Sequence, residues 1–166
     1  EIMIYNEEPI DALYHSTCGG QTESSCNVWG KNVSYLSSVQ CRYCKQSRHY
    51  ETIQVFSVQD FTTSLGVNNS QPQVKISENT PGGRVKTVKI NDKELSGEKL
   101  RRILGLPSTW CDFKVNAEQV KIKSRGYGHG LGLCQYGANG MALSGKTYRQ
   151  ILKHYYKGIE FSQLNY

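Results

Sequence analysis

The sequence predicts an α+β fold, with antiparallel or mixed β-sheets and peripheral helices. Candidate strands and helices are intermixed along the chain without a regular alternation, which argues against a doubly wound parallel sheet. No internal repeat or low-complexity tract is present. The 166 residues, 37% of them hydrophobic, are enough for one sizeable core, so we expect a single domain over residues 1–166.

The first part of the chain predicts a hairpin followed by a long loop. Residues 2–5 and 10–17 have strand character, and Asn6 and Pro9 supply turn chemistry between them. Residues 21–48 are rich in Ser, Cys, Asn and Gly and lack periodicity. A loop of this length inside a compact domain is usually functional or tied down, here by its cysteines.

The central part predicts two strand-to-helix units separated by a loop. Residues 50–56 alternate as a strand and lead into a helix that begins near Ser57. Residues 67–83, with their Asn, Ser, Pro and Gly, predict a loop. Residues 84–90 predict a second strand, followed by a helix that begins near Ser96.

The last part predicts two short strands, a glycine-rich turn and two helices. The strands cover residues 113–115 and 120–123, and the helices cover residues 135–143 and 147–156. Residues 140–147 match the phosphate-loop pattern G-x-x-x-x-G-K-T. That loop must follow a buried strand to form an anion cradle, and here a helix precedes it, so we predict no nucleotide site.

The net charge of +6 and a pI of about 9.0 suit an anionic partner such as nucleic acid, a membrane surface or a bacterial wall. The basic residues are scattered rather than gathered in one run. No recognition helix or base-stacking motif is present, so we predict no nucleic-acid partner. No apolar run approaches the roughly 20 residues that a membrane-spanning helix needs.

Four of the six cysteines fall in one early segment, which predicts a local cross-link through a metal ion or disulfides. The C-x-x-C spacing at residues 41–44 lets two thiolates meet one tetrahedral zinc ion. The predicted ligands are Cys18, Cys26, Cys41 and Cys44, with His15 as the alternative fourth ligand. Such a metal would be structural, because four protein ligands leave no position for water. One or two disulfides are the alternative.

The stretch from Arg125 to Met141 is the strongest candidate for a functional site. Six glycines lie between residues 126 and 140, interleaved with aromatic and amide side chains. The backbone there must adopt unusual dihedrals or pass close to another group. A tight turn needed only for packing is the alternative.

Two motifs together resemble the stage II sporulation protein D family, which includes amidase-enhancer proteins of bacterial cell walls. The first is Tyr14-His-Ser-Thr-Cys-Gly-Gly-Gln-Thr22, followed by Trp29 and the C-x-x-C pair. The second is Gly126-Tyr-Gly-His-Gly-Leu-Gly-Leu-Cys-Gln-Tyr-Gly-Ala138. The resemblance covers nearly the whole chain.

The resemblance implies a sporulation lytic transglycosylase that acts on peptidoglycan stripped of its stem peptides. Such an enzyme cleaves the β-1,4 bond between N-acetylmuramic acid and N-acetylglucosamine and leaves a 1,6-anhydro end. The implied location is the septal space between mother cell and forespore, outside the cytoplasm, with a membrane anchor outside this chain. Implied partners are glycan strands, other engulfment proteins and a wall amidase. A non-catalytic glycan-binding or amidase-enhancer module is the alternative.

The resemblance also implies a glycan-binding groove with two walls. Hydroxyl, amide and aromatic groups suit such a groove, because sugars are held by hydrogen bonds and by contacts with aromatic faces. The first wall would comprise His15, Ser16, Thr17, Gly19, Gly20 and Gln21, and the second Tyr127, His129, Gln135 and Tyr136.

The chain departs from the family pattern at two points. The family's catalytic glutamate lies in a pattern like E-A-L-K-A-Q-A-V-A-A-R-T-Y, which nothing in this sequence matches. We therefore expect a fragment without the catalytic acid, which would lie upstream; the acidic residues near the first motif are not assigned that role. Cys134 stands where the family commonly has serine.

Overall fold

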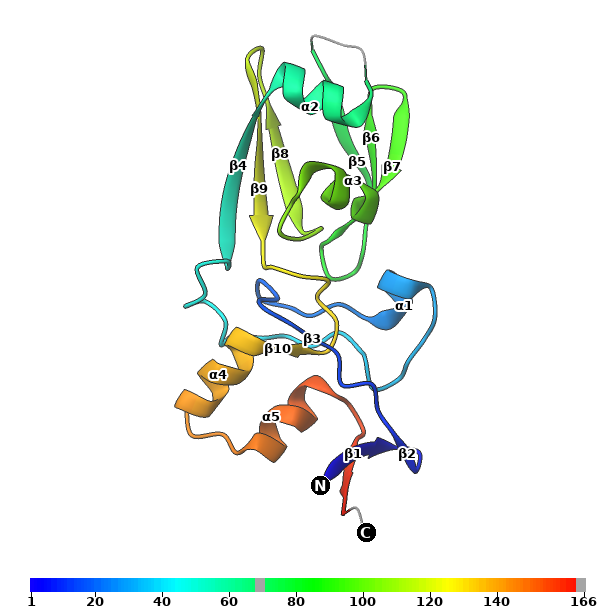
Figure 1. Ribbon diagram of the computed structural model, residues 1–166, viewed down its shortest axis with the longest axis vertical. Helices are drawn as coiled ribbons and strands as arrows, with labels where there is room; N and C mark the ends of the chain where they lie inside the picture. The colour runs from blue at the N-terminus through cyan, green and yellow to red at the C-terminus, as the bar shows by residue number, and fades with distance from the viewer. Residues whose placement is uncertain (68–70, 164–166) are drawn as a thin grey trace. The chain divides into compact units, whose positions relative to one another are not determined.

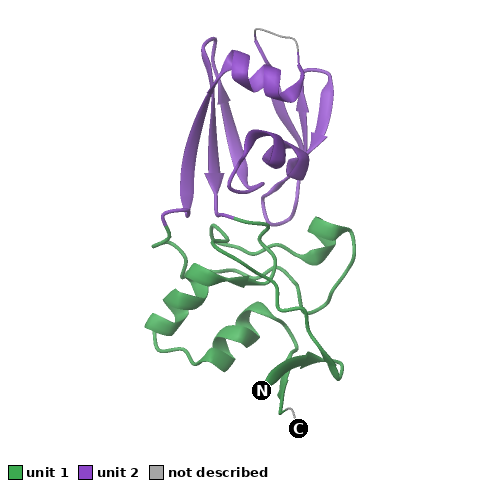
Figure 2. Ribbon diagram, viewed as in Figure 1, with its two compact units in different colours: residues 1–47, 128–166 green, residues 48–127 purple. Residues whose placement is uncertain are grey.

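The computed structural model of the chain describes residues 1–67 and 71–163. It confirms the α+β class, with helices and mainly antiparallel sheets (Figure 1). The chain divides into two compact units (Figure 2). Unit 1 comprises residues 1–47 and 128–166, and unit 2 comprises residues 48–127. The sequence alone does not mark this division, because no linker-like composition stands at either junction.

Unit 2 consists of two antiparallel three-stranded sheets and two helices. The strand orders are β4-β9-β8 and β5-β6-β7. The strands are β4 (Glu51–Ser57), β5 (Val74–Asn79), β6 (Val85–Ile90), β7 (Lys93–Ser96), β8 (Cys111–Val115) and β9 (Gln119–Arg125). The helices are α2 (Val58–Leu65) and α3 (Gly97–Leu104).

The core of unit 2 collects the apolar faces of these elements. Alternation along β9 buries Val120 and Ile122 completely, while the intervening lysines point away. Phe61 of α2 and Leu100 of α3 are also fully buried and belong to the same cluster. The sheets and helices of unit 2 therefore share one hydrophobic core.

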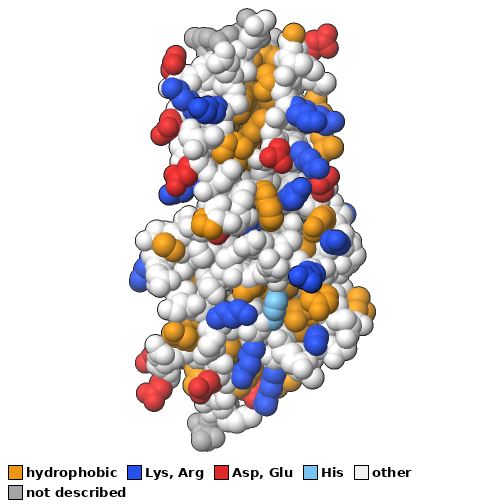
Figure 3. Space-filling model, turned by 180° about the vertical axis from the view of Figure 1, so that it is seen from behind, with side chains coloured by type: hydrophobic (Ala, Val, Ile, Leu, Met, Phe, Trp, Pro, Cys, Tyr) orange, Lys and Arg blue, Asp and Glu red, His pale blue; other side chains and the backbone are white. Residues whose placement is uncertain are grey.

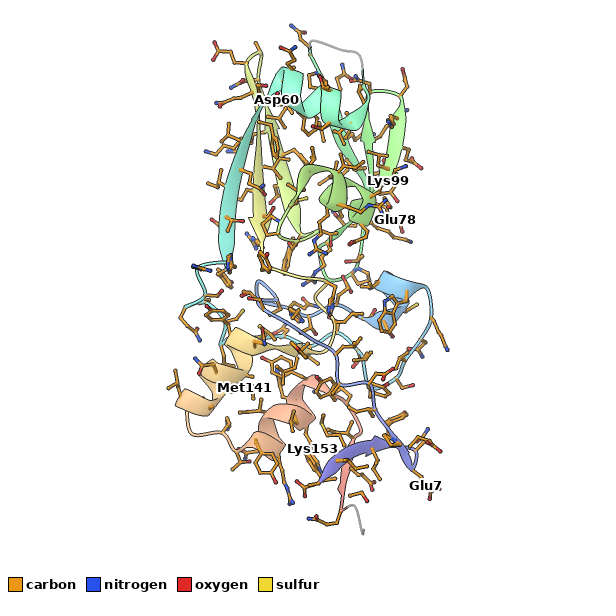
Figure 4. The ribbon with its side chains drawn as sticks, in the orientation of Figure 1. Glu7, Asp60, Glu78, Lys99, Met141 and Lys153 are labelled. Atoms are coloured by element: carbon orange, nitrogen blue, oxygen red, sulfur yellow. The ribbon has the colours of Figure 1, made fainter. Side chains whose placement is uncertain are left out.

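Both helices of unit 2 begin at the serines that the sequence indicates. The Ser57 hydroxyl accepts the backbone N–H of Asp60, which Figure 4 labels near the start of α2. The Ser96 hydroxyl accepts the backbone N–H of Lys99 in the same way. Each cap satisfies a donor that the first helical turn leaves unpaired.

The prediction of a loop over residues 67–83 is wrong in part. Residues 74–79 form β5, an edge strand held by its pairing with β6. Its sequence V-K-I-S-E-N has only two apolar residues, so most of its stability comes from the neighbouring strand rather than from its own pattern. Residues 68–70 lie outside the described residues.

Unit 1 has shorter elements. One sheet has the order β11-β1-β2, from β1 (Ile2–Tyr5), β2 (Glu8–Pro9) and β11 (Glu160–Ser162). Another pairs β3 (Tyr14–His15) with β10 (Leu133–Cys134). The helices are α1 (Ser25–Trp29), α4 (Gln135–Leu143) and α5 (Tyr148–Tyr155). The strand predicted over residues 10–17 is therefore reduced to β3, and α1 interrupts the predicted loop of residues 21–48.

Residues 140–147, which match the phosphate-loop letters, span the end of α4 and the start of α5. Thr147 caps α5 in a capping box with Gln150. Met141 belongs to α4 and is buried (Figure 4). A helix rather than a strand therefore leads into this segment, as the sequence indicates.

The protein has a net positive charge, but on the face shown in Figure 3 the basic side chains do not gather in one patch. Lys and Arg side chains are spread over it and alternate with hydrophobic and acidic ones. Among the described residues, no helix has the length and apolar character to cross a membrane.

Candidate functional site

The two motifs of the sequence, more than 100 residues apart, are joined in unit 1. β3 and β10 pair in parallel, with Leu133 opposite Tyr14 and Cys134 opposite His15 (Figure 1). The backbone N–H of Tyr136 donates to the Ser16 carbonyl at 3.1 Å. The segment that follows β3 therefore lies against the glycine-rich stretch.

Two histidines from the two motifs bind the same residue, Leu131. His15 Nδ1 lies 2.9 Å from the Leu131 carbonyl oxygen, and because a carbonyl only accepts, this nitrogen carries the proton. The Leu131 N–H donates to His129 Nδ1 at 3.0 Å, so that nitrogen carries none. The ring centroids are 5.7 Å apart. In their neutral forms the two rings therefore have opposite tautomers, with Nε2 an acceptor in His15 and a donor in His129.

Gly128 is required by this arrangement. Its φ of +113° is a conformation that other residues rarely adopt. A Cβ atom at this position would lie 2.9 Å from the Cβ of His15. The absence of a side chain lets the glycine-rich backbone approach the first motif closely.

The other residues predicted to contact glycan differ in accessibility. Ser16, Gly20, Gln21 and Tyr136 are partly exposed and Gln135 is exposed, all in unit 1. Gly19 is buried, and so is Thr17, which hydrogen-bonds Ser47 at 2.6 Å. Tyr127 is the last residue of unit 2; it is 47% exposed, and its ring lies against His49 with centroids 4.6 Å apart.

Glu23 is an acidic residue near the first motif, and its contacts give it a structural role. Its side chain is buried and accepts hydrogen bonds from the Ser24 N–H at 2.9 Å and the Asn27 amide at 2.7 Å. Its own N–H donates to the Gly130 carbonyl at 2.8 Å. These contacts tie α1 to the glycine-rich stretch.

Four buried cysteines converge beside the joined motifs. The Sγ atoms of Cys18, Cys41, Cys44 and Cys134 all lie within 4.8 Å of one another. The Cys18 and Cys44 sulfurs are 3.5 Å apart. A tetrahedral zinc ion with Zn–S bonds of about 2.3 Å places its sulfurs about 3.8 Å apart, whereas a disulfide requires about 2.05 Å. The geometry fits one tetrahedral metal ion better than two disulfides.

The ligand set differs from the predicted one at one position. The structure brings Cys18, Cys41 and Cys44 together as predicted, but Cys134 of β10 completes the group instead of Cys26. Cys26 lies on α1 and is exposed. His15 is not a member of the group either. Cys134 was not predicted as a ligand because it lies 90 residues after Cys44 in the sequence. The cysteine in place of the family's usual serine was the signal that could have indicated it.

Two of these sulfurs lie beside hydrogen-bond donors that can stabilise negative charge. Cys134 Sγ accepts backbone N–H bonds from Gly137 and Cys18, each at 3.3 Å, and it caps α4. The Tyr155 hydroxyl lies 3.2 Å from Cys41 Sγ. Hydrogen bonds to thiolate sulfur and a helix N-terminus both stabilise the negative charge.

The four thiols cannot all lose their protons without a cation. Hydrogen bonds with Cys134, Cys18 and Cys44 hold the pKa of Cys41 well below its ordinary value. Cys18 also forms hydrogen bonds with the other three cysteines, and these bonds, first of all the one with Cys134, raise the pKa of Cys18. Neighbouring thiolates repel one another at these distances, so deprotonation of the whole cluster requires a bound divalent metal.

Comparison with known proteins gives strong matches over almost the whole chain. Stage II sporulation protein D of Bacillus subtilis (strain 168) is 40% identical over 165 residues, which is 98% of this chain and 48% of that protein. The protein of the same name from Bacillus amyloliquefaciens is 39% identical, again over 98% of this chain and 48% of the relative.

Over this shared region, the chain is similar to stage II sporulation protein D, as the two sequence motifs indicate. The amidase enhancer of Bacillus subtilis (strain 168) is a more distant relative, 28% identical over 95% of this chain and 30% of its own length. No family model matches the chain. The chain spans about half the length of the stage II sporulation protein D sequences that it matches.

Proposed function

We propose that this chain is the glycan-holding part of a peptidoglycan lytic transglycosylase of sporulation. The observation that carries the proposal is the β3–β10 pairing, which joins the two family motifs around Leu131. The substrate would be glycan strands from which the stem peptides have been removed. The place of action would be the wall in the septal space outside the cytoplasm, with a membrane anchor outside these 166 residues.

The proposed reaction consumes no water. The 6-hydroxyl of N-acetylmuramic acid attacks C1 of the same sugar, while the C1–O4 bond to N-acetylglucosamine breaks. One carboxyl group can protonate the leaving O4 and remove the proton of the attacking hydroxyl, acting as acid and then base. The family resemblance places that acid in a segment that no part of this sequence matches. This chain's own residues would bind and orient the strand.

His129 suits a sugar hydroxyl as a hydrogen-bond donor, because it is half-buried and its Nε2 carries the proton. His15 is 4% exposed and its Nε2 is shielded from solvent, so it would support the site through its hydrogen bond to the Leu131 carbonyl. Ser16, Gln21, Gln135 and the aromatic Tyr136 add the polar and apolar groups that carbohydrate binding needs.

Zinc is the proposed occupant of the four-cysteine cluster. Four buried sulfur ligands select zinc among the common structural metals and leave no open position for catalysis. When bound, zinc would supply only cross-linking. It would fasten the Cys41–Cys44 loop and the start of α4 to the segment after β3, and thereby hold the two motifs together.

The relative named amidase enhancer supports a second candidate function. It matches 95% of this chain, so the same fold region also serves in a protein with that name. In this alternative the chain binds glycan without cutting it and acts beside a wall amidase. Both functions require glycan binding, and they differ in whether the full-length protein cleaves.

Glycan binding tests the part of the proposal that concerns this chain. His129→Gln is expected to weaken the affinity for peptide-stripped wall glycan by about tenfold, the effect of losing one good hydrogen bond. Co-sedimentation of the protein with the glycan measures this affinity. His154→Gln, at a half-buried position of α5 outside the two motifs, serves as the matched control and is expected to bind as wild type does. Equal binding by wild type and His129→Gln would remove His129 from the proposed site, and no binding by wild type would overturn the glycan-holding role.

A further inference from the structure

A separate cavity of about 290 Å³ lies within unit 2, at the open edge of β4. It is bounded by residues of β4, by the turn that follows α3, and by the ring pair of His49 and Tyr127. Ligand pockets commonly measure about 300 to 1,000 Å³, so this one has room for about one sugar ring.

The cavity combines an aromatic wall with polar groups. Tyr127 is about half exposed, and His49 supports its ring. Such an exposed, supported ring is a platform for the apolar face of a sugar. Leu106 and Pro107 add apolar surface that an N-acetyl methyl group can contact.

Two side-chain oxygen atoms on β4 have unused hydrogen-bonding capacity. Thr52 Oγ1 and Gln54 Oε1 are shielded from solvent and have no hydrogen-bond partner among the residues that the structure describes. Buried polar atoms of this kind are costly unless a ligand or water meets them. Thr52 and Gln54 both line the cavity, so these oxygens are candidate acceptors for an occupant.

The charge of the cavity favours an anionic ligand. Arg101 lines it, held by a hydrogen bond from Nε to the Leu106 carbonyl at 3.3 Å. Its only described ion pair is with Glu98, at 3.6 Å, and that carboxylate is 68% exposed and therefore weakly bound. None of the described residues that line the cavity is Asp or Glu. A guanidinium in this setting binds a carboxylate by charge-assisted hydrogen bonds.

We propose that this cavity is a subsite for an N-acetylmuramic acid residue whose lactyl carboxyl group is free. Arg101 binds the carboxylate, Tyr127 stacks on the ring, and Thr52 and Gln54 accept hydrogen bonds from hydroxyl or amide groups. Removal of the stem peptide is what frees this carboxyl group, so the subsite distinguishes stripped from intact glycan. The inference rests on the proposed glycan-holding function and adds to it the feature of the substrate that is recognised.

Calorimetric titration with two soluble tetrasaccharides tests the subsite. One is alternating N-acetylglucosamine and N-acetylmuramic acid without peptides, and the other contains N-acetylglucosamine alone. Wild type is expected to bind the first about tenfold more tightly, the effect of one charge-assisted hydrogen bond. Arg101→Gln is expected to abolish this preference and leave binding of the second unchanged. Arg102→Gln removes the same charge from the adjacent, exposed position of α3 and is expected to keep the preference.

A second variant keeps the test decisive if Arg101→Gln perturbs folding. Thr52→Val keeps the shape of the side chain and removes a hydroxyl without a described partner, so its fold is expected to be unchanged. It should weaken binding of both tetrasaccharides about threefold or more. If wild type binds the muramic acid tetrasaccharide and both variants bind it equally well, the subsite is wrong while the glycan-holding function stands. If wild type binds neither tetrasaccharide, both proposals fall.

Discussion

Cys134→Ala is expected to destabilise unit 1 by about 4 kcal/mol or more. Effects of this size are exceptional for single substitutions and indicate loss of a structural metal or a comparable feature. The substitution removes one of four converging sulfurs and also the cap of α4. Hydrogen exchange followed segment by segment, with zinc content measured on the same samples, should show lost protection in unit 1 and a loss of bound zinc.

Cys26→Ala provides the matched control for this experiment. Cys26 is exposed on α1, so its removal is expected to change stability by no more than about 0.5 kcal/mol and to leave one zinc ion per chain. If Cys26→Ala and Cys134→Ala have equal effects, or if chelation leaves the melting temperature of wild type unchanged, the proposed zinc site is wrong.

Gly137→Ala is expected to destabilise the protein by about 3 kcal/mol, although alanine is the better helix former by about 1 kcal/mol. Gly137 lies on α4, where it faces the cysteine cluster. A Cβ atom at this position would overlap the Tyr155 hydroxyl and the Cys41 sulfur. Neither group can move without disturbing the cluster, so the clash cannot relax cheaply.

Chemical denaturation of Gly137→Ala beside Asn139→Ala measures this effect. Asn139 is exposed on the same helix, and its replacement by alanine is expected to be neutral or slightly stabilising. A Gly137→Ala protein at least as stable as wild type would contradict the close packing of α4 against the cysteines.

The sequence allowed the elements of unit 2 to be predicted wherever local signals were strong. The alternation of β9 and the serine caps of α2 and α3 are properties of adjacent residues, and their predictions agree with the structure. β5 and β11 could not be predicted from their own residues. β5 has only two apolar residues and is held by its pairing with β6, and β11 has three residues and pairs with β1 at the other end of the sequence.

Parts of the candidate site were also predictable from local signals, and other parts arise only on folding. The histidines and glycines were indicated by their unusual local density, but their common contact with Leu131 arises only from the β3–β10 pairing. The fourth cysteine was missed because clustering in sequence favoured Cys26, whereas folding brings Cys134 to the other three. The cavity near Arg101 had no signal in the sequence, since its residues come from β4, α3 and the segments next to β4, α3 and β9.

Digestion of purified, peptide-stripped wall glycan by the full-length protein tests the central claim most directly. Mass spectrometry of the products is expected to find 1,6-anhydro ends, and the 166-residue chain alone is expected to bind the glycan without cutting it. Products with ordinary reducing ends would contradict transglycosylation. Binding without any cleavage by the full-length protein would contradict an enzymatic role and favour the amidase-enhancer alternative.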